Sequence, residues 1–136
     1  MKLLLALLFV PGLVAAQALN PDVSQSNIGS TICVAGWTKT VRPPVTYTNG
    51  VKKRKMLAAG LLWKQSPLYE LDHIVPLTLG GAPRTAVNLQ LQLWPEAKVK
   101  DRLEVRLNKK VCARKMTLTD ARYCIFLDWK QCAKSN

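Results

Sequence analysis

The strongest constraint on the fold lies between residues 68 and 112, where the spacing of apolar residues changes from that of strands to that of a helix. Residues 68–75 are predicted to form a strand, and residues 88–93 alternate polar and apolar side chains as a half-buried strand does. A loop containing Gly80-Gly81 separates them, and Trp94-Pro95 begins a helix with proline at its favoured first position. We therefore expect strand, loop, strand and helix in that order.

Further helices are predicted on both sides of this unit. Residues 51–62 indicate a basic helix, and Thr117-x-x-Asp120 precedes a last helix that runs to about Trp129. Upstream, residues 31–34 predict a short strand. In the helix after Pro95, an apolar residue recurs at every fourth position: Val99, Leu103, Leu107 and Val111. Basic residues cover much of the rest of that helix: Lys98, Lys100, Arg102, Arg106, Lys109 and Lys110.

Residues 1–16 are predicted to be a secretory signal peptide. Lys2 gives a positive start, an apolar run follows to Val10, and small residues end the segment at Ala15-Ala16. Cleavage after Ala16 leaves 120 of the 136 residues, 17–136, which is enough for one small domain. No later segment is long and apolar enough to cross a bilayer, so we expect a secreted or periplasmic protein with no membrane partner.

Four cysteines predict two disulfides in an exported chain: Cys33, Cys112, Cys124 and Cys132. Three pairings are possible. We favour Cys33–Cys112, whose long loop would contribute about 4–5 kcal/mol in the chain-entropy model, together with Cys124–Cys132. Eight residues of continuous helix separate Cα atoms by about 12 Å, so the second bridge requires the last helix to end between its cysteines.

The charge indicates the class of partner. The chain has 20 Lys and Arg against 8 Asp and Glu, and without Lys2 the count is 19 against 8, a net charge of +11. A small domain this basic favours polyanions, because binding releases counterions from phosphates. Nucleic acid, anionic lipid and anionic glycan are the candidates. The densest basic run, Lys52-Lys53-Arg54-Lys55, is a weak signal alone, because such runs are usually solvated surface.

His73 is the only histidine of the chain, and it follows Asp72 at the end of the first predicted strand. An imidazole with an unperturbed pKa of about 6.5 is mostly neutral at pH 7–8, as a general base must be. Because side chains alternate along a strand, Asp72 should point away from His73. An isolated Asp-His pair is usually structural, so the surrounding residues decide how this pair is interpreted.

These surroundings resemble the HNH endonucleases, which are ββα-metal nucleases. The resemblance lies in Asp72-His73-Ile74-Val75-Pro76-Leu77, then Gly80-Gly81, Asn88-Leu89 and Lys100-Asp101-Arg102-Leu103-Glu104, in this order. It is strongest over residues 68–108, and residues 33–38 and 41–43 extend it to a group of small exported HNH-type proteins. The implied fold is α+β, with a ββα-metal finger (a two-stranded antiparallel hairpin plus helix), flanking helices and disulfide bridges.

The resemblance also implies roles for the site residues. His73 would activate the attacking water as general base, and Asn88 would orient the imidazole. The third HNH position, a metal-binding histidine or asparagine, falls on the first turn of the helix, where Glu96 stands. Asp72 and Glu96 would then hold Mg²⁺ or Mn²⁺, because carboxylates suit hard cations. Glu70 is either another metal-site carboxylate or, as we favour, a paired acid at the edge of the core.

Nucleic acid is expected to contact Arg84 in the loop, Lys98 and Arg102 on the helix, and the basic run Lys52, Lys53, Arg54 and Lys55. We thus expect a monomeric, exported, metal-dependent endonuclease that hydrolyses DNA, or RNA, with little sequence specificity, because no base-reading module is present. The alternative is a non-catalytic cationic nucleic-acid-binding protein on a degenerate HNH frame. A membrane-active cationic protein is a third hypothesis, but the chain lacks a long amphipathic basic helix with exposed aromatics.

Overall fold

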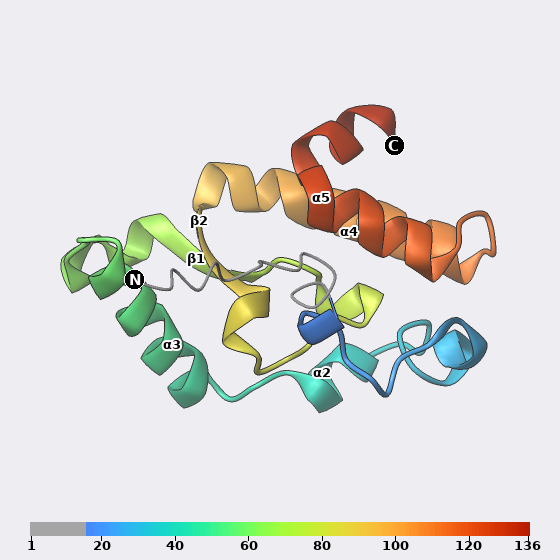
Figure 1. The fold of residues 1–136 in the computed structure, drawn as a ribbon, viewed down its shortest axis with the longest axis horizontal. Coiled ribbons are helices and arrows are strands. Elements are labelled where there is room, and N and C mark those ends of the chain that lie inside the picture. Colours follow the sequence, from blue (N-terminus) through green and yellow to red (C-terminus); the bar gives the residue numbers. More distant parts are fainter. Residues whose placement is uncertain (1–15) are drawn as a thin grey trace, which may run out of the picture.

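The computed structural model describes residues 16–136, so the predicted signal peptide, apart from Ala16, lies outside the described residues. The described chain is an α+β structure with a two-stranded antiparallel sheet. Strand β1 (Tyr69–His73) pairs with β2 (Leu89–Leu93), and helix α4 (Trp94–Cys112) begins directly after β2 (Figure 1). The expected hairpin followed by a helix is therefore confirmed.

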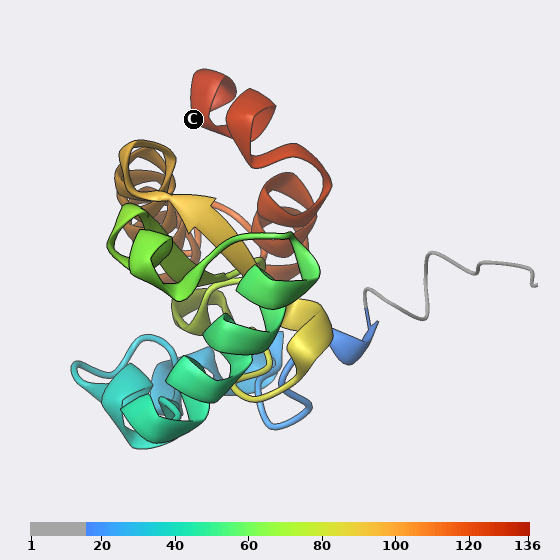
Figure 2. The same cartoon turned by 90° about the vertical axis from the view of Figure 1, so that its left-hand side faces the viewer.

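The hairpin lies between two groups of helices. Figure 1 shows α4 beside α5 (Leu118–Ser135) on one side, with α3 (Val45–Ala58) and the short α2 (Trp37–Val41) on the other. In the side view of Figure 2, the last turns of α5 project away from the rest of the molecule. Short 3₁₀ helices connect these elements: η1 (Gln25–Ser30), η2 (Trp63–Leu68), η3 (Leu77–Leu79) and η4 (Ala86–Asn88). No helix within residues 16–136 has the length and apolar character that a membrane span requires.

The main core forms where α4 and α5 face each other. Leu103 and Leu107 of α4 are fully buried against residues of α5 such as Ile125. Two expectations for α4 were wrong: Val99 is 39% exposed, whereas Lys100 is 0% exposed. The buried stripe therefore runs through Ala97, Lys100, Leu103, Leu107 and Val111.

The segment upstream of the hairpin differs from the prediction. Residues 31–34 form turns, with the Val34 N–H donating to the Thr31 carbonyl at 2.8 Å, rather than a strand. Helix α3 begins at Val45, six residues before the expected start at Val51. Pro44 precedes its first turn in an extended conformation (φ −64°, ψ 152°). A proline at that place loses no intrahelical hydrogen bond, so it is compatible with the helix that follows.

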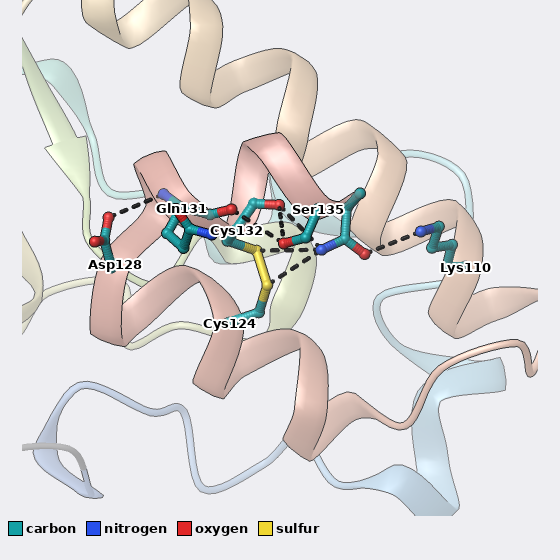
Figure 3. The surroundings of a disulfide bond; sticks show 7 residues. Lys110, Cys124, Asp128, Gln131, Cys132 and Ser135 are labelled. Carbon is teal, nitrogen blue, oxygen red and sulfur yellow. Dashed lines mark hydrogen bonds between the residues drawn. A yellow bond between two sulfur atoms is a disulfide. The ribbon is translucent and has the colours of Figure 1, made fainter.

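Two disulfides are present, in the favoured pairing. Cys33 is bonded to Cys112 and Cys124 to Cys132, with Cα–Cα distances of 5.6 and 5.3 Å. The expected end of the last helix between its cysteines takes the form of a kink at Asp128, which has the non-helical angles φ −157° and ψ 88°. The Asp128 carboxylate accepts a hydrogen bond from the Gln131 N–H at 3.0 Å and so caps the turns beyond the kink (Figure 3).

Candidate functional site

Asp72 and His73 end strand β1 and face different neighbours. In the sheet register Asp72 lies opposite Gln90, and His73 lies opposite Leu89. The Asp72 carboxylate is 6% exposed and points to α4. The half-buried imidazole of His73 instead contacts the loop between the strands. This divergence follows from the alternation of side chains along a strand.

The His73 ring is held in one tautomer by the backbone. Its Nε2 lies 3.0 Å from the Pro83 carbonyl oxygen. A carbonyl only accepts hydrogen bonds, so Nε2 carries the proton, and Nδ1 of the neutral ring keeps a free lone pair. Burial lowers the pKa of His73, an effect that the Pro83 hydrogen bond and the Asp72 charge oppose. At neutral pH the ring is therefore a neutral base with Nδ1 as its accepting atom.

Asn88 uses its whole side chain to close the loop that contacts His73. The amide is fully buried. Its Oδ1 accepts from the Val75 N–H at 2.8 Å, and its Nδ2 donates to the carbonyls of Val75 and Ala82, both at 3.0 Å. These bonds fix the backbone next to Pro83, whose carbonyl holds the imidazole. Any orienting effect of Asn88 on His73 thus passes through the loop.

Gly81 lets the two sides of this loop approach closely. A Cβ at this position would lie 1.8 Å from the Val75 carbonyl oxygen and 2.9 Å from Asn88 Nδ2. Such distances are far inside van der Waals contact, and the first involves backbone that cannot rotate away. Only glycine therefore fits where the Asn88 amide joins the two sides of the loop.

Behind Asp72 lies a buried ammonium group. Lys100 Nζ is 3.1 and 2.9 Å from the two carboxylate oxygens of Asp72, 2.8 Å from the His73 carbonyl and 2.7 Å from Glu104 Oε1. Gln90 Nε2 donates to Asp72 Oδ2 at 2.9 Å. Both oxygens of Asp72 are therefore occupied, and Lys100 joins α4 to the end of β1.

Acidic side chains gather around a cavity of about 90 Å³ at this point. Half of the eight acidic residues of the chain line it, together with His73 and Arg42: they are Glu70, Asp72, Asp101 and Glu104. Burial, reinforced by neighbouring carboxylates, raises the pKa of Glu70 and of Asp101. Burial also raises the pKa of Glu104, to about 7, against the opposing effect of Lys100. A very basic protein thus concentrates negative charge beside its one histidine.

The residues predicted to hold a metal have separate partners. Asp72 is bonded to Lys100 and Gln90, whereas Glu96 forms an exposed ion pair at 2.6 Å with Lys130 of α5. In the part of the chain that the structure describes, no group of three or more His, Cys, Asp or Glu side chains is arranged to hold a metal ion. The predicted pair does not fit a divalent cation as it stands, and the metal requirement stays a prediction.

Most of the predicted nucleic-acid contacts are exposed. Arg84 stacks over the Tyr47 ring at 5.7 Å from its centroid, and its carbonyl accepts a hydrogen bond from the Tyr47 hydroxyl. Lys52 differs, because its ammonium donates to the carbonyls of Ser66 at 2.9 Å and Tyr69 at 2.6 Å. It therefore ties α3 to the start of β1. The exposed members of the set are Lys53, Arg54, Arg84, Lys98 and Arg102, while Lys55 is half-buried.

Sequence reasoning missed the burial of Lys100 behind Asp72 and several residues that line the cavity. One signal was available: Lys100 lies three residues before Leu103 and three after Ala97, at the spacing of the buried stripe. Arg42, Asp101 and Glu104 have no such signal as single residues. Comparisons of the chain with protein-family models, with curated proteins and with solved structures found no match.

Proposed function

We propose that this protein is an exported phosphodiester hydrolase that cleaves nucleic acid, with β1, β2 and α4 as a ββα finger of the HNH type. The observation that supports the proposal best is the state of His73. Its Nε2–H is held by the Pro83 carbonyl, and burial keeps the ring neutral. A neutral imidazole with one free nitrogen, on the wall of a cavity, has the properties that a general base needs.

The chemistry would proceed from Nδ1 of His73. This atom takes a proton from water as the water oxygen attacks phosphorus, and the leaving oxygen departs with the electron pair of its P–O bond and takes a proton from solvent. Arg42 lines the same cavity and offers a guanidinium group to the non-bridging phosphate oxygens. The exposed cations of α3, α4 and the loop at Arg84 would hold the flanking phosphates. The proposal that the protein is exported rests on the predicted signal peptide and is supported by the two disulfides.

Cleavage of a supercoiled plasmid and of a labelled RNA by the purified protein tests this function. We expect wild-type protein to cleave, and His73→Ala to be slower by about 10²–10⁴-fold, the usual contribution of general-base catalysis. Its binding to DNA should stay close to wild type. Because burial lowers the pKa of His73, the wild-type rate should stay constant from neutral pH to below pH 6.5 and then fall. Cleavage by His73→Ala at the wild-type rate would exclude this mechanism.

A second candidate is the non-catalytic nucleic-acid-binding protein. The observation that favours it is the acidic lining of the cavity, since carboxylates repel a phosphate that approaches His73. In that case purified wild-type protein binds DNA but leaves plasmid and RNA intact, with or without added Mg²⁺ or Mn²⁺.

A further inference from the structure

The Asp72 carboxylate is where the resemblance would place a metal, yet a cation of the chain already lies there. Lys100 Nζ is within 3.1 Å of both Asp72 oxygens, and Gln90 takes a further position on one of them. Asp72 is also 6% exposed. A magnesium ion usually keeps several water molecules when it binds to a protein carboxylate. The cavity of about 90 Å³ beside Asp72 has room for water, so it is the bonds already made to both carboxylate oxygens that oppose a metal there.

Lys100 is also held too firmly to be displaced easily. Its side chain is 0% exposed, and it donates to Glu104 Oε1 at 2.7 Å and to the His73 carbonyl at 2.8 Å. If the ammonium moved away, it would leave Asp72 and Glu104 as buried carboxylates without a cation beside them, which is strongly unfavourable. If it stayed, it would repel a divalent cation at the same carboxylate.

We propose that the ammonium of Lys100 takes the place of the divalent metal at Asp72, so that this site works without one. Lys100 is then a positioning residue. It neutralises Asp72, and through the His73 carbonyl it fixes the end of β1 that presents the imidazole. A test of this proposal by cleavage rests on the proposed function, whereas a test by metal binding does not.

Metal binding tests the proposal directly on the folded protein. Titration of wild-type protein with Mn²⁺, followed by the EPR signal of the free ion and by calorimetry, should show no binding that depends on Asp72. Lys100→Met removes the ammonium while nearly keeping the side-chain volume, so Asp72 and Glu104 become available as ligands. We expect this variant to unfold at lower temperature in EDTA and to regain several degrees on adding Mn²⁺. Lys109→Met, at an exposed position of the same helix, should behave as wild type does.

Stoichiometric Mn²⁺ binding by wild-type protein that is lost in Asp72→Asn would overturn the proposal, even if Lys100→Met did not fold. For cleavage, we expect equal wild-type rates in EDTA and in Mn²⁺. Cleavage that EDTA abolishes and Mn²⁺ restores would also overturn it. If wild-type protein cleaves under neither condition, the proposed function fails, and the titrations still decide the role of Lys100.

Discussion

Glu104 links a proton to folding because its carboxyl group is buried, although it pairs with the ammonium of Lys100. Burial raises the pKa of Glu104 from 4.5 to about 7. Between these values the folded protein holds a proton that the unfolded chain has lost. The free energy of unfolding should therefore fall as the pH rises from 4.5 to 7. The upper bound for this loss is about 3 kcal/mol.

Urea denaturation across this pH range measures the effect. Glu104→Gln cannot titrate, so its stability should change less between pH 4.5 and 7 than that of wild-type protein. Glu96→Gln is the matched control, because Glu96 is a surface carboxylate paired with Lys130 on α5. Parallel pH profiles for wild-type protein and Glu104→Gln would show that Glu104 ionises normally.

How well single residues could be predicted depends on whether their chemistry is visible in the sequence. His73 and Asn88 stand out in the sequence because a lone histidine and the residues around it resemble a nuclease motif, and their catalytic roles stay predictions. Lys100 was assigned to the solvated side of its helix, as lysines usually are. Its burial becomes favourable only when Asp72, which lies 28 residues earlier, meets it across the fold. The prediction of Glu96 as a metal ligand rests on helix register and on the preference of hard cations for carboxylates, and neither shows that Glu96 pairs with Lys130.

Among the elements, the loop between β1 and β2 determines where His73 lies. Asn88→Ala would leave the Val75 N–H and the Val75 and Ala82 carbonyls without their partner inside the protein. Each unsatisfied buried group costs about 1–3 kcal/mol, so we expect a loss of about 3 kcal/mol or more in the free energy of unfolding. Gly81→Ala should be at least as harmful, because its Cβ meets the Val75 carbonyl.

Gly29→Ala is the control for Gly81→Ala, because a Cβ at Gly29 meets nothing within 4 Å. Its stability should stay within about 0.5 kcal/mol of wild type, as for most surface substitutions. All three free energies come from urea denaturation. Equal stability of Gly81→Ala and Gly29→Ala would show that the loop relaxes without cost.

Helices and strands could be predicted best where the local pattern of residues agrees with their burial in the fold. The alternation of polar and apolar residues predicts a half-buried strand where β2 lies, and the proline after Trp94 predicts the start of a helix where α4 begins. Both elements are present at these positions. The break in α5 could be predicted from disulfide geometry alone, because a continuous helix would hold Cys124 and Cys132 too far apart. Residues 31–34 have β-branched side chains but lack a partner strand in the described structure, so they form turns.

For the whole molecule, the Cys33–Cys112 bridge should be the more important disulfide. It joins the N-terminal segment to the end of α4 across 79 residues, whereas Cys124–Cys132 spans only 8. The chain-entropy model gives about 4.5 kcal/mol for the long loop and about 2.5 kcal/mol for the short one. Thermal unfolding of the paired Cys→Ser variants should follow this order. A larger loss on removing Cys124–Cys132 would show that the kinked end of α5 stabilises more of the fold than its position suggests.

The distribution of charge over the whole molecule determines how it should bind nucleic acid. Because four carboxylates line the cavity beside His73, few acidic residues remain to offset the cations elsewhere: Asp22, Glu96, Asp120 and Asp128. We expect duplexes of unrelated sequence to bind almost equally, since in the proposed interface these cations would contact phosphates rather than base edges. With about four to six phosphate contacts, log K should fall against log salt with a slope of about −4 to −5.

Two neighbouring lysines of α3 make this prediction specific. Lys53 is exposed, so Lys53→Gln should remove one contact and reduce the slope by about 0.9. Lys52 already donates to the carbonyls of Ser66 and Tyr69, so Lys52→Gln should leave the slope nearly unchanged and lower the stability instead. Fluorescence anisotropy at several salt concentrations gives the slopes, and urea denaturation gives the stabilities. Binding that ignores salt, or a strong preference for one short sequence, would contradict a phosphate-based interface and indicate a surface that reads bases.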